Sequence, residues 1–189
     1  MGKILGFDIS ENNTLDLTDF KTMKEEGAEF IIIRSSYGWS YEDEDFRRHC
    51  ELADEVGLRK MAYHYSYAKN LETAKYEAER CRKVIESAGV GLEMVFYDLE
   101  EPSLIGWATE AAEVFMKELG LNCGIYANLH WMENYIDWAR LNCPIWVAQY
   151  NSRCDLKGYI WQFTDAYRIR GKYVDGNYMF LPGDDGEDE

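Results

Sequence analysis

The sequence contains no long apolar segment. No stretch approaches the roughly 18 apolar residues that a membrane-spanning helix needs. Residues 4–8 form a short strand pattern at the point where a signal peptide would have its apolar region. We therefore expect no signal peptide and no insertion into a membrane, and we expect the chain to be made in the cytoplasm.

Basic residues and the motifs of metal and nucleotide sites are also scarce. The chain has 20 Lys and Arg residues against 35 Asp and Glu, a net charge of −15, which disfavours binding of nucleic acid through a basic patch. The five cysteines form no CxxC pair and the three histidines form no HExxH motif, so we expect free thiols and no zinc site. No GxGxxG or GxxxxGK[ST] motif follows the first strand pattern, which counts against a nucleotide-binding fold.

What the chain does contain is a regular alternation of strand and helix patterns. Five strand patterns alternate with five helical patterns, in the order 4–8, 18–26, 30–34, 43–56, 60–67, 71–88, 94–97, 103–119, 123–127 and 131–140. Three short strand patterns follow without room for crossover helices, at 145–149, 159–163 and 172–175. This order predicts an α/β fold with a parallel sheet, either a barrel or a doubly wound sheet.

The length of 189 residues suits one domain with a substantial core. We expect a single catalytic domain over residues 1–181 and a disordered acidic tail over 182–189. Asn70 and Ser103 are the expected N-terminal caps of the helices at 71–88 and 103–119.

Three of the strand patterns end in acidic residues. Asp8 closes the first, Asp98 and Glu100 close the fourth, and Asp175 closes the last. Because side chains alternate along a strand, Asp98 and Glu100 share a face, with Cα atoms about 6.5 to 7 Å apart. Glu101 faces the other way and is left out of the predicted site. Active sites of α/β barrels lie at the carboxyl ends of strands, and closure makes the first and last strands neighbours. One cleft can therefore hold all four acids.

Four carboxylates without a basic partner raise one another's pKa values. That cost is useful if one carboxyl must stay protonated as a general acid, as glycoside hydrolysis requires. Clustered oxygens also suit a divalent cation, but the sequence shows no EF-hand spacing, so we expect no metal and no cofactor. Aromatic and amide side chains at other strand ends would suit a carbohydrate cleft; they are Tyr126, Asn128, Trp146, Gln149 and Gln162.

Eight short blocks of the sequence, in order over residues 5–180, resemble the family 25 glycoside hydrolases, the muramidases of many phages and bacteria. These blocks are GFDIS at 6–10, IRSSYG at 33–38, YHY at 63–65, YDLE at 97–100, IYAN at 125–128, IWVAQY at 145–150, WQFT at 161–164 and VDGN at 174–177. The resemblance implies a flattened TIM-like barrel of five β/α units followed by three β strands.

The resemblance also implies an activity and a set of site residues. The activity is hydrolysis of the β-1,4 bond between N-acetylmuramic acid and N-acetylglucosamine in bacterial peptidoglycan. Glu100 matches the general acid, Asp98 matches its partner, and Asp8 and Asp175 match the remaining acids. We expect catalysis assisted by the substrate's acetamido group, with retention of configuration. The predicted substrate-binding residues are Tyr37, Tyr63, Tyr65, Tyr126, Asn128, Trp146, Gln149 and Gln162.

Two alternatives remain open from the sequence. One is a chitinase-like hydrolase of other N-acetylated glycans, although Met94 and Phe96 stand where a chitinase motif would carry further acids. The other is a glycan-binding barrel without activity. We expect a monomer that acts on the cell wall, and release through a membrane pore, as for a phage endolysin, would bring it there.

Overall fold

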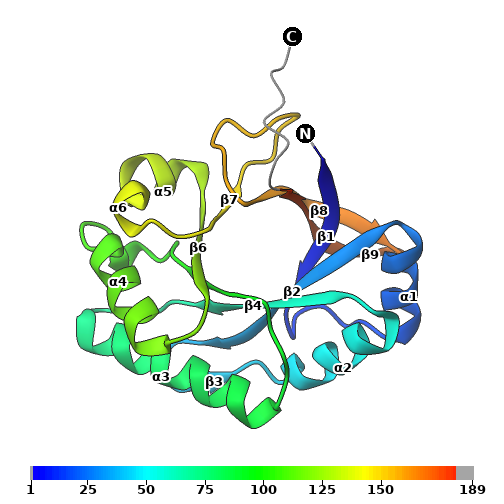
Figure 1. Ribbon diagram of the computed structural model, residues 1–189, viewed down its shortest axis with the longest axis horizontal. Helices are drawn as coiled ribbons and strands as arrows, with labels where there is room; N and C mark the ends of the chain where they lie inside the picture. Colours follow the sequence, from blue (N-terminus) through cyan, green and yellow to red (C-terminus); the bar gives the residue numbers. More distant parts are fainter. Residues whose placement is uncertain (1, 182–189) are drawn as a thin grey trace.

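A closed barrel of eight strands forms the centre of the molecule (Figure 1). The computed structural model describes residues 2–181, so the predicted acidic tail at 182–189 lies outside the described residues. Neighbouring strands in the barrel follow the order β1-β9-β8-β7-β6-β5-β4-β2, and pairing of β1 with β2 closes it. The strands are β1 (Lys3–Ile9), β2 (Ala28–Tyr37), β4 (Arg59–Tyr65), β5 (Val95–Asp98), β6 (Cys123–Asn128), β7 (Ile145–Ala148), β8 (Ile160–Ile169) and β9 (Lys172–Phe180).

Seven of these strands run parallel, and β9 runs antiparallel to both of its neighbours, β8 and β1. A two-residue strand, β3 (Tyr41–Glu42), pairs with the end of β2 outside the barrel. The predicted order of five β/α units followed by three strands is confirmed, and the doubly wound alternative is excluded. The last two strands are longer than expected because they form a hairpin through Arg170 and Gly171.

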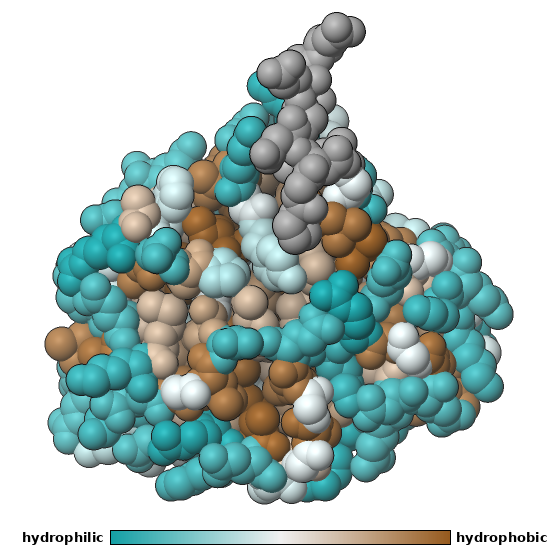
Figure 2. Space-filling view, in the orientation of Figure 1, coloured by the Kyte–Doolittle hydropathy of each residue, from teal (hydrophilic) through white to brown (hydrophobic). Residues whose placement is uncertain are grey.

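Six α-helices surround part of the barrel within the described residues (Figure 1). They cover its left, lower and right sides in that view, and β7, β8 and β9 are joined to one another without intervening helices. On the face that Figure 2 shows, hydrophilic residues dominate the periphery, and most of the visible apolar residues lie nearer the centre. The helices are α1 (Leu17–Glu25), α2 (Phe46–Val56), α3 (Leu71–Ala88), α4 (Ala108–Leu119), α5 (Leu129–Asn134) and α6 (Trp138–Leu141).

The residue at which each helix begins is decided by capping hydrogen bonds rather than by the spacing of apolar residues. Asn70 caps α3 as predicted and accepts a bond from the Thr73 amide. The prediction that Ser103 caps a helix is wrong: Pro102–Leu104 is a 3₁₀ turn, α4 begins at Ala108, and Ser103 Oγ donates to the Ala68 carbonyl instead. The helix expected at 131–140 is two short helices, because Asp137 provides a second N-terminal cap.

The barrel has two apolar layers because successive residues of each strand face opposite sides. Phe30, Ile32 and Phe96 belong to the cluster inside the barrel, whereas Ile31 and Tyr97 pack in the layer between the barrel and the helices. Burial on both faces accounts for the continuous apolar run of β2.

Gly6 tests how tightly the barrel interior is packed. A Cβ atom on Gly6 would lie 2.5 Å from the ring of Phe30, which is 0% exposed. We expect Gly6→Ala to lower the free energy of unfolding by about 1 to 3 kcal/mol through overpacking, a fall in Tm of roughly 2 to 4 °C per kcal/mol at this chain length. Gly91→Ala is the matched control, since no atom lies within 4 Å of its added Cβ. Equal thermal unfolding curves for the two variants would contradict this account.

Candidate active site

The four predicted carboxylates line one cleft of about 330 Å³ at the carboxyl ends of the parallel strands. Asp8 comes from β1, Asp98 ends β5, Glu100 follows two residues later, and Asp175 lies in β9. Asp8 and Asp98 are 6% and 4% exposed, while Glu100 and Asp175 are half-buried. The cleft therefore concentrates negative charge where little water can screen it.

Asp8 and Asp175 form a pair across the β1–β9 contact, where they are direct cross-strand partners. Gln162 Nε2 donates to Asp8 Oδ2 at 2.9 Å and to Asp175 Oδ2 at 3.2 Å, and Asn177 Nδ2 donates to Asp8 Oδ2 at 2.8 Å. Burial and the Asp175 charge raise the pKa of Asp8 well above its ordinary value, although the two amides oppose this. Burial, followed by the charge of Asp165, raises the pKa of Asp175 to about 6.

Asp98 and Glu100 are the other pair. Burial, then the charges of Glu100 and Asp8, raise the pKa of Asp98 well above its usual range. Asp98 Oδ1 is buried and has no hydrogen-bond partner among the described residues. Burial, then the charges of Glu101 and Asp175, raise the pKa of Glu100. Glu100 therefore keeps its proton to a higher pH than an ordinary glutamate, and Asp98 offers an unused acceptor.

Glu101, which was left out of the predicted site, does not line the cleft but acts on it from nearby. Its charge acts on Glu100, and its Oε1 atom accepts a hydrogen bond from Tyr65 OH at 3.0 Å. Because β5 ends at Asp98, strand alternation does not decide where Glu101 points.

The expectation of carboxylates without a basic partner is wrong, because Arg34 lines the cleft. Its charge lowers the pKa of Asp98 against the larger effects of burial and Glu100. Arg34 is held by Asp43 at 2.9 Å and Glu11 at 3.0 Å. A register shift between Arg34 and Ser36 interrupts the alternation of β2, so the guanidinium lies 4.7 Å from the Tyr37 ring centroid.

Aromatic and amide side chains build the wall opposite Arg34. Tyr126 OH and Tyr150 OH both donate to Gln162 Oε1, at 2.9 and 3.1 Å. These bonds fix the Gln162 amide so that its nitrogen faces the acids. Trp146 Nε1 donates to Asn177 Oδ1 at 2.8 Å, which orients the Asn177 amide in the same way. Tyr150 shares a strand face with Trp146 in the sequence pattern but was not among the predicted substrate-binding residues. Sequence reasoning missed Asn177, whose signal was its place two residues after Asp175 on the same strand face.

The structure brings together most of the predicted substrate-binding residues, but not all. Five of them line the main cleft: Tyr63, Tyr65, Tyr126, Trp146 and Gln162. Asn128 lines an adjoining cavity of about 230 Å³ that also contacts Glu100 and Tyr126.

Tyr37 and Gln149 do not line either of these two cavities. The Tyr37 ring is stacked on Tyr41, with centroids 5.1 Å apart. The Gln149 side chain holds the loop between β7 and β8 through two hydrogen bonds with Asp155, to its carboxylate and from its amide N–H.

The sequence pattern that describes glycosyl hydrolases family 25 matches residues 7–172. The chain belongs to this family. That membership agrees with the barrel and with carboxylates gathered at the ends of its strands.

Named relatives of this family 25 chain include an autolytic lysozyme of Clostridium acetobutylicum, 22% identical, with 90% of this chain and 58% of the relative aligned. The chain thus spans less than two thirds of that protein. The solved CTP1L endolysin is 25% identical with a TM-score of 0.83, covering 95% of this chain and 67% of that one. The modular autolysin LytC of Streptococcus pneumoniae, solved with a synthetic peptidoglycan ligand, is 21% identical with a TM-score of 0.80, covering 94% and 47%.

Residues 2–181, which the structure describes, lack two kinds of feature. No group of three or more His, Cys, Asp or Glu side chains in this range is arranged to hold a metal ion. No helix in this range is long and apolar enough to cross a membrane.

The raised pKa of Asp98 predicts a gain in stability from its removal. A carboxyl whose folded pKa exceeds its unfolded value destabilises the fold once the pH rises above the unfolded value. We expect Asp98→Asn to raise the free energy of unfolding at pH 7 by about 1 kcal/mol, or roughly 2 to 4 °C in Tm, while activity falls. The gain should disappear as the pH drops below about 4, where both states are protonated. A variant less stable than the parent chain at pH 7 in thermal unfolding would contradict this prediction.

Proposed function

We propose that the chain hydrolyses the β-1,4 bond between N-acetylmuramic acid and N-acetylglucosamine in bacterial peptidoglycan, with Glu100 as general acid. The observation that carries the proposal is the position of Glu100, which lines both the main cleft and the adjoining cavity. A glycan that occupies both cavities would place the bond between two sugars beside a carboxyl whose pKa is raised. The names of the autolytic lysozyme and the CTP1L endolysin support the same substrate class.

The first step needs a proton donor and a nucleophile. Glu100 gives its proton to the glycosidic oxygen as the bond from that oxygen to C1 breaks. The acetamido oxygen of the same sugar attacks C1 and forms an oxazolinium ion. The acetamido N–H would donate to Asp98 Oδ1, the buried acceptor without a partner in the described chain. Negative charge on Asp98 would stabilise the positive charge that develops on the ring.

The second step returns the site to its starting state. A water molecule loses a proton to Glu100 and attacks C1 from the face that the leaving sugar vacated. The oxazolinium ring opens back to the acetamide, so the new reducing end keeps its original configuration. Asp8, Asp175 and their amide partners would bind and orient the substrate's polar groups without taking part in bond breaking.

We also propose that residues 1–181 act as one catalytic domain, as a monomer, on the cell wall in the manner of a phage endolysin. Similarity to the CTP1L endolysin supports this role.

The products of digestion test the proposed bond specificity. The protein is mixed with purified peptidoglycan and, separately, with chitin, and the new reducing ends are identified by borohydride reduction and mass spectrometry. We expect reduced N-acetylmuramic acid from peptidoglycan and no release from chitin. N-acetylglucosamine ends would indicate a glucosaminidase, release from chitin would indicate the chitinase-like alternative, and binding without release would favour a glycan-binding barrel.

Glu100→Gln tests the proton donor. This change keeps the shape of the side chain but removes the acidic proton, so we expect kcat/KM on peptidoglycan to fall by about 10²-fold or more. Glu110→Gln on α4 is the matched control, because Glu110 is not among the residues that line either cavity. Near-normal turnover of Glu100→Gln would remove Glu100 from the role.

Glu101→Gln tests the electrostatic environment of that donor. The Glu101 charge raises the pKa of Glu100, second only to burial. Removing it should lower the pKa of Glu100, so the fall in kcat/KM at high pH should begin at a lower pH in this variant. The rate below that fall should change little, because the proton donor is intact. If the fall in kcat/KM at high pH begins at the same pH as in the parent chain, or at a higher pH, Glu101 does not act on Glu100 in this way.

A further inference from the structure

A cluster of exposed aromatic side chains lies on the β2–β3 hairpin and the segment after β4. Ten large apolar side chains are strongly exposed in the part of the chain that the structure describes. Five of them lie on the hairpin, on the segment after β4 or on the adjoining helix α3: Trp39, Tyr41, Tyr67, Leu71 and Tyr76. Single exposed apolar side chains need no explanation, but a contiguous group marks a binding surface. We refer to Trp39, Tyr41 and Tyr67 as the hairpin platform; they are 62%, 60% and 49% exposed.

The hairpin platform is continuous with the catalytic cleft. Tyr65 lines the cleft, and its ring centroid lies 5.0 Å from that of Tyr67. Tyr67 lies 6.5 Å from Tyr37, and Tyr37 stacks on Tyr41 at 5.1 Å with the rings 2° from parallel. Tyr37, which does not line the cleft, is thus the support that joins the cleft aromatics to the platform.

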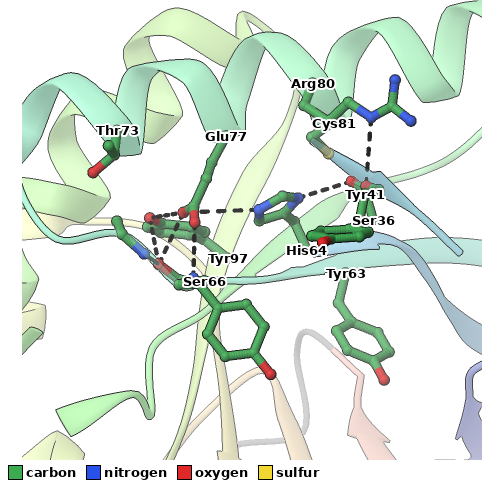
Figure 3. Close-up of polar contacts among 12 residues, drawn as sticks. Ser36, Tyr41, Tyr63, His64, Ser66, Thr73, Glu77, Arg80, Cys81 and Tyr97 are labelled. Atoms are coloured by element: carbon green, nitrogen blue, oxygen red, sulfur yellow. Dashed lines mark hydrogen bonds and ion pairs between the residues drawn. The ribbon is translucent and has the colours of Figure 1, made fainter. Parts of the chain in front are cut away.

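Several backbone and side-chain bonds hold the platform in place. The Gly38 amide donates to the Tyr65 carbonyl at 3.0 Å, which fastens the hairpin turn to β4. Arg80 of α3 donates to the Tyr41 carbonyl at 3.4 Å (Figure 3). Its guanidinium also pairs with Glu42 at 3.3 Å. A ligand that binds here meets rings already fixed in position, so little conformational entropy is lost.

The sheet order gives the platform a direction relative to the site. The strands β7, β6, β5, β4, β2 and β3 are consecutive neighbours. The adjoining cavity lies at β6 and β7, where Asn128 and Ala148 line it. Glu100 follows β5, Tyr65 ends β4, and the platform lies at β2 and β3. A linear ligand that crosses the strand ends from the adjoining cavity through the cleft would reach the platform next.

The chemistry of the platform suits a sugar chain better than an aliphatic or cationic partner. Tyr and Trp present flat apolar faces with a hydroxyl or N–H at the edge, which matches the apolar faces and hydroxyl edges of pyranose rings. A cavity of about 460 Å³ extends the surface beyond Trp39, between it and Tyr76 and Arg80 of α3. We propose that the hairpin platform binds further sugar units of the same glycan strand, beyond those that occupy the cleft. This inference rests on the proposed function.

The test compares long and short substrates in the double variant Trp39→Ala/Tyr41→Ala. The substrates are purified peptidoglycan glycan strands and a soluble tetrasaccharide of the same repeat, which is too short to fill both cavities and the platform. We expect KM for the long strands to rise about tenfold with kcat unchanged. Both constants for the tetrasaccharide should stay at the parent values. Leu121→Ala is the control, because Leu121 is an exposed apolar residue (45%) near the amino end of β6, at the opposite end of the barrel.

The outcomes separate this inference from the proposed function. If the parent chain hydrolyses neither substrate, the proposed function fails. If the parent chain is active and the double variant has an unchanged KM for long strands, only the platform inference fails. Equal losses on both substrates would also overturn it, since they would place the defect in the cleft or the fold. A parent chain that is a dimer by light scattering and a double variant that is a monomer would identify the platform as a subunit interface instead.

Discussion

The buried carboxylate of Glu77 ties α3 to the part of the barrel that carries the cleft (Figure 3). It accepts hydrogen bonds from Ser66 Oγ at 2.9 Å, Tyr97 OH at 2.7 Å and the Tyr67 amide at 2.7 Å. It also faces His64 Nε2 at 3.8 Å. Burial alone would lower the pKa of His64, but its contacts with Cys81 and Glu77 raise the pKa to about 9. With its pKa raised this far, His64 carries a proton at neutral pH, so loss of the Glu77 carboxylate would leave a buried charge without its partner.

The side chains of this network point from β4 and β5 toward α3, and they hold in place the neighbouring residues that point into the cleft. His64 lies between Tyr63 and Tyr65 in β4, and Tyr97 precedes Asp98 in β5, so each outward contact sets the position of an inward cleft residue. Figure 3 shows Tyr63 pointing away from α3 on the other side of the strand from His64. The cleft needs such support because its carboxylates repel one another and are poorly solvated. Inside, the amides of Gln162 and Asn177 offset part of that cost, and they are fixed in turn by tyrosine and tryptophan donors.

Strand alternation was enough to predict that Asp98 faces the cleft, and the order of elements was enough to predict the barrel. Both signals are local or depend only on sequence order. Glu100 lines the cleft from a position beyond the end of β5, where alternation no longer applies. Arg34 was missed although alternation places it on the same strand face as Phe30 and Ile32, inside the barrel. Which side chains Arg34 meets there is decided by long-range packing, and β2 alone does not show that the acids of β1 and β5 line the same cleft. The cap at Ser103 was wrong for a similar reason. Pro102 allows a 3₁₀ turn there, and a long-range bond to Ala68 uses the hydroxyl that would have capped the helix.

Asp175 reaches the cleft by a route that the sequence did not reveal. It was expected to end a strand in the same way as Asp8 and Asp98, but β9 is antiparallel and continues to Phe180. At the end of an antiparallel strand it would have lain at the opposite rim of the barrel. It lies beside Asp8 because the β1–β9 register pairs these two residues, and Asn177 shares its face because it lies two residues further along the same strand. A shift of one residue in that register would turn both side chains out of the cleft. The acidic site therefore depends on closure of the barrel, and it exists only when the first and last strands pair in this register.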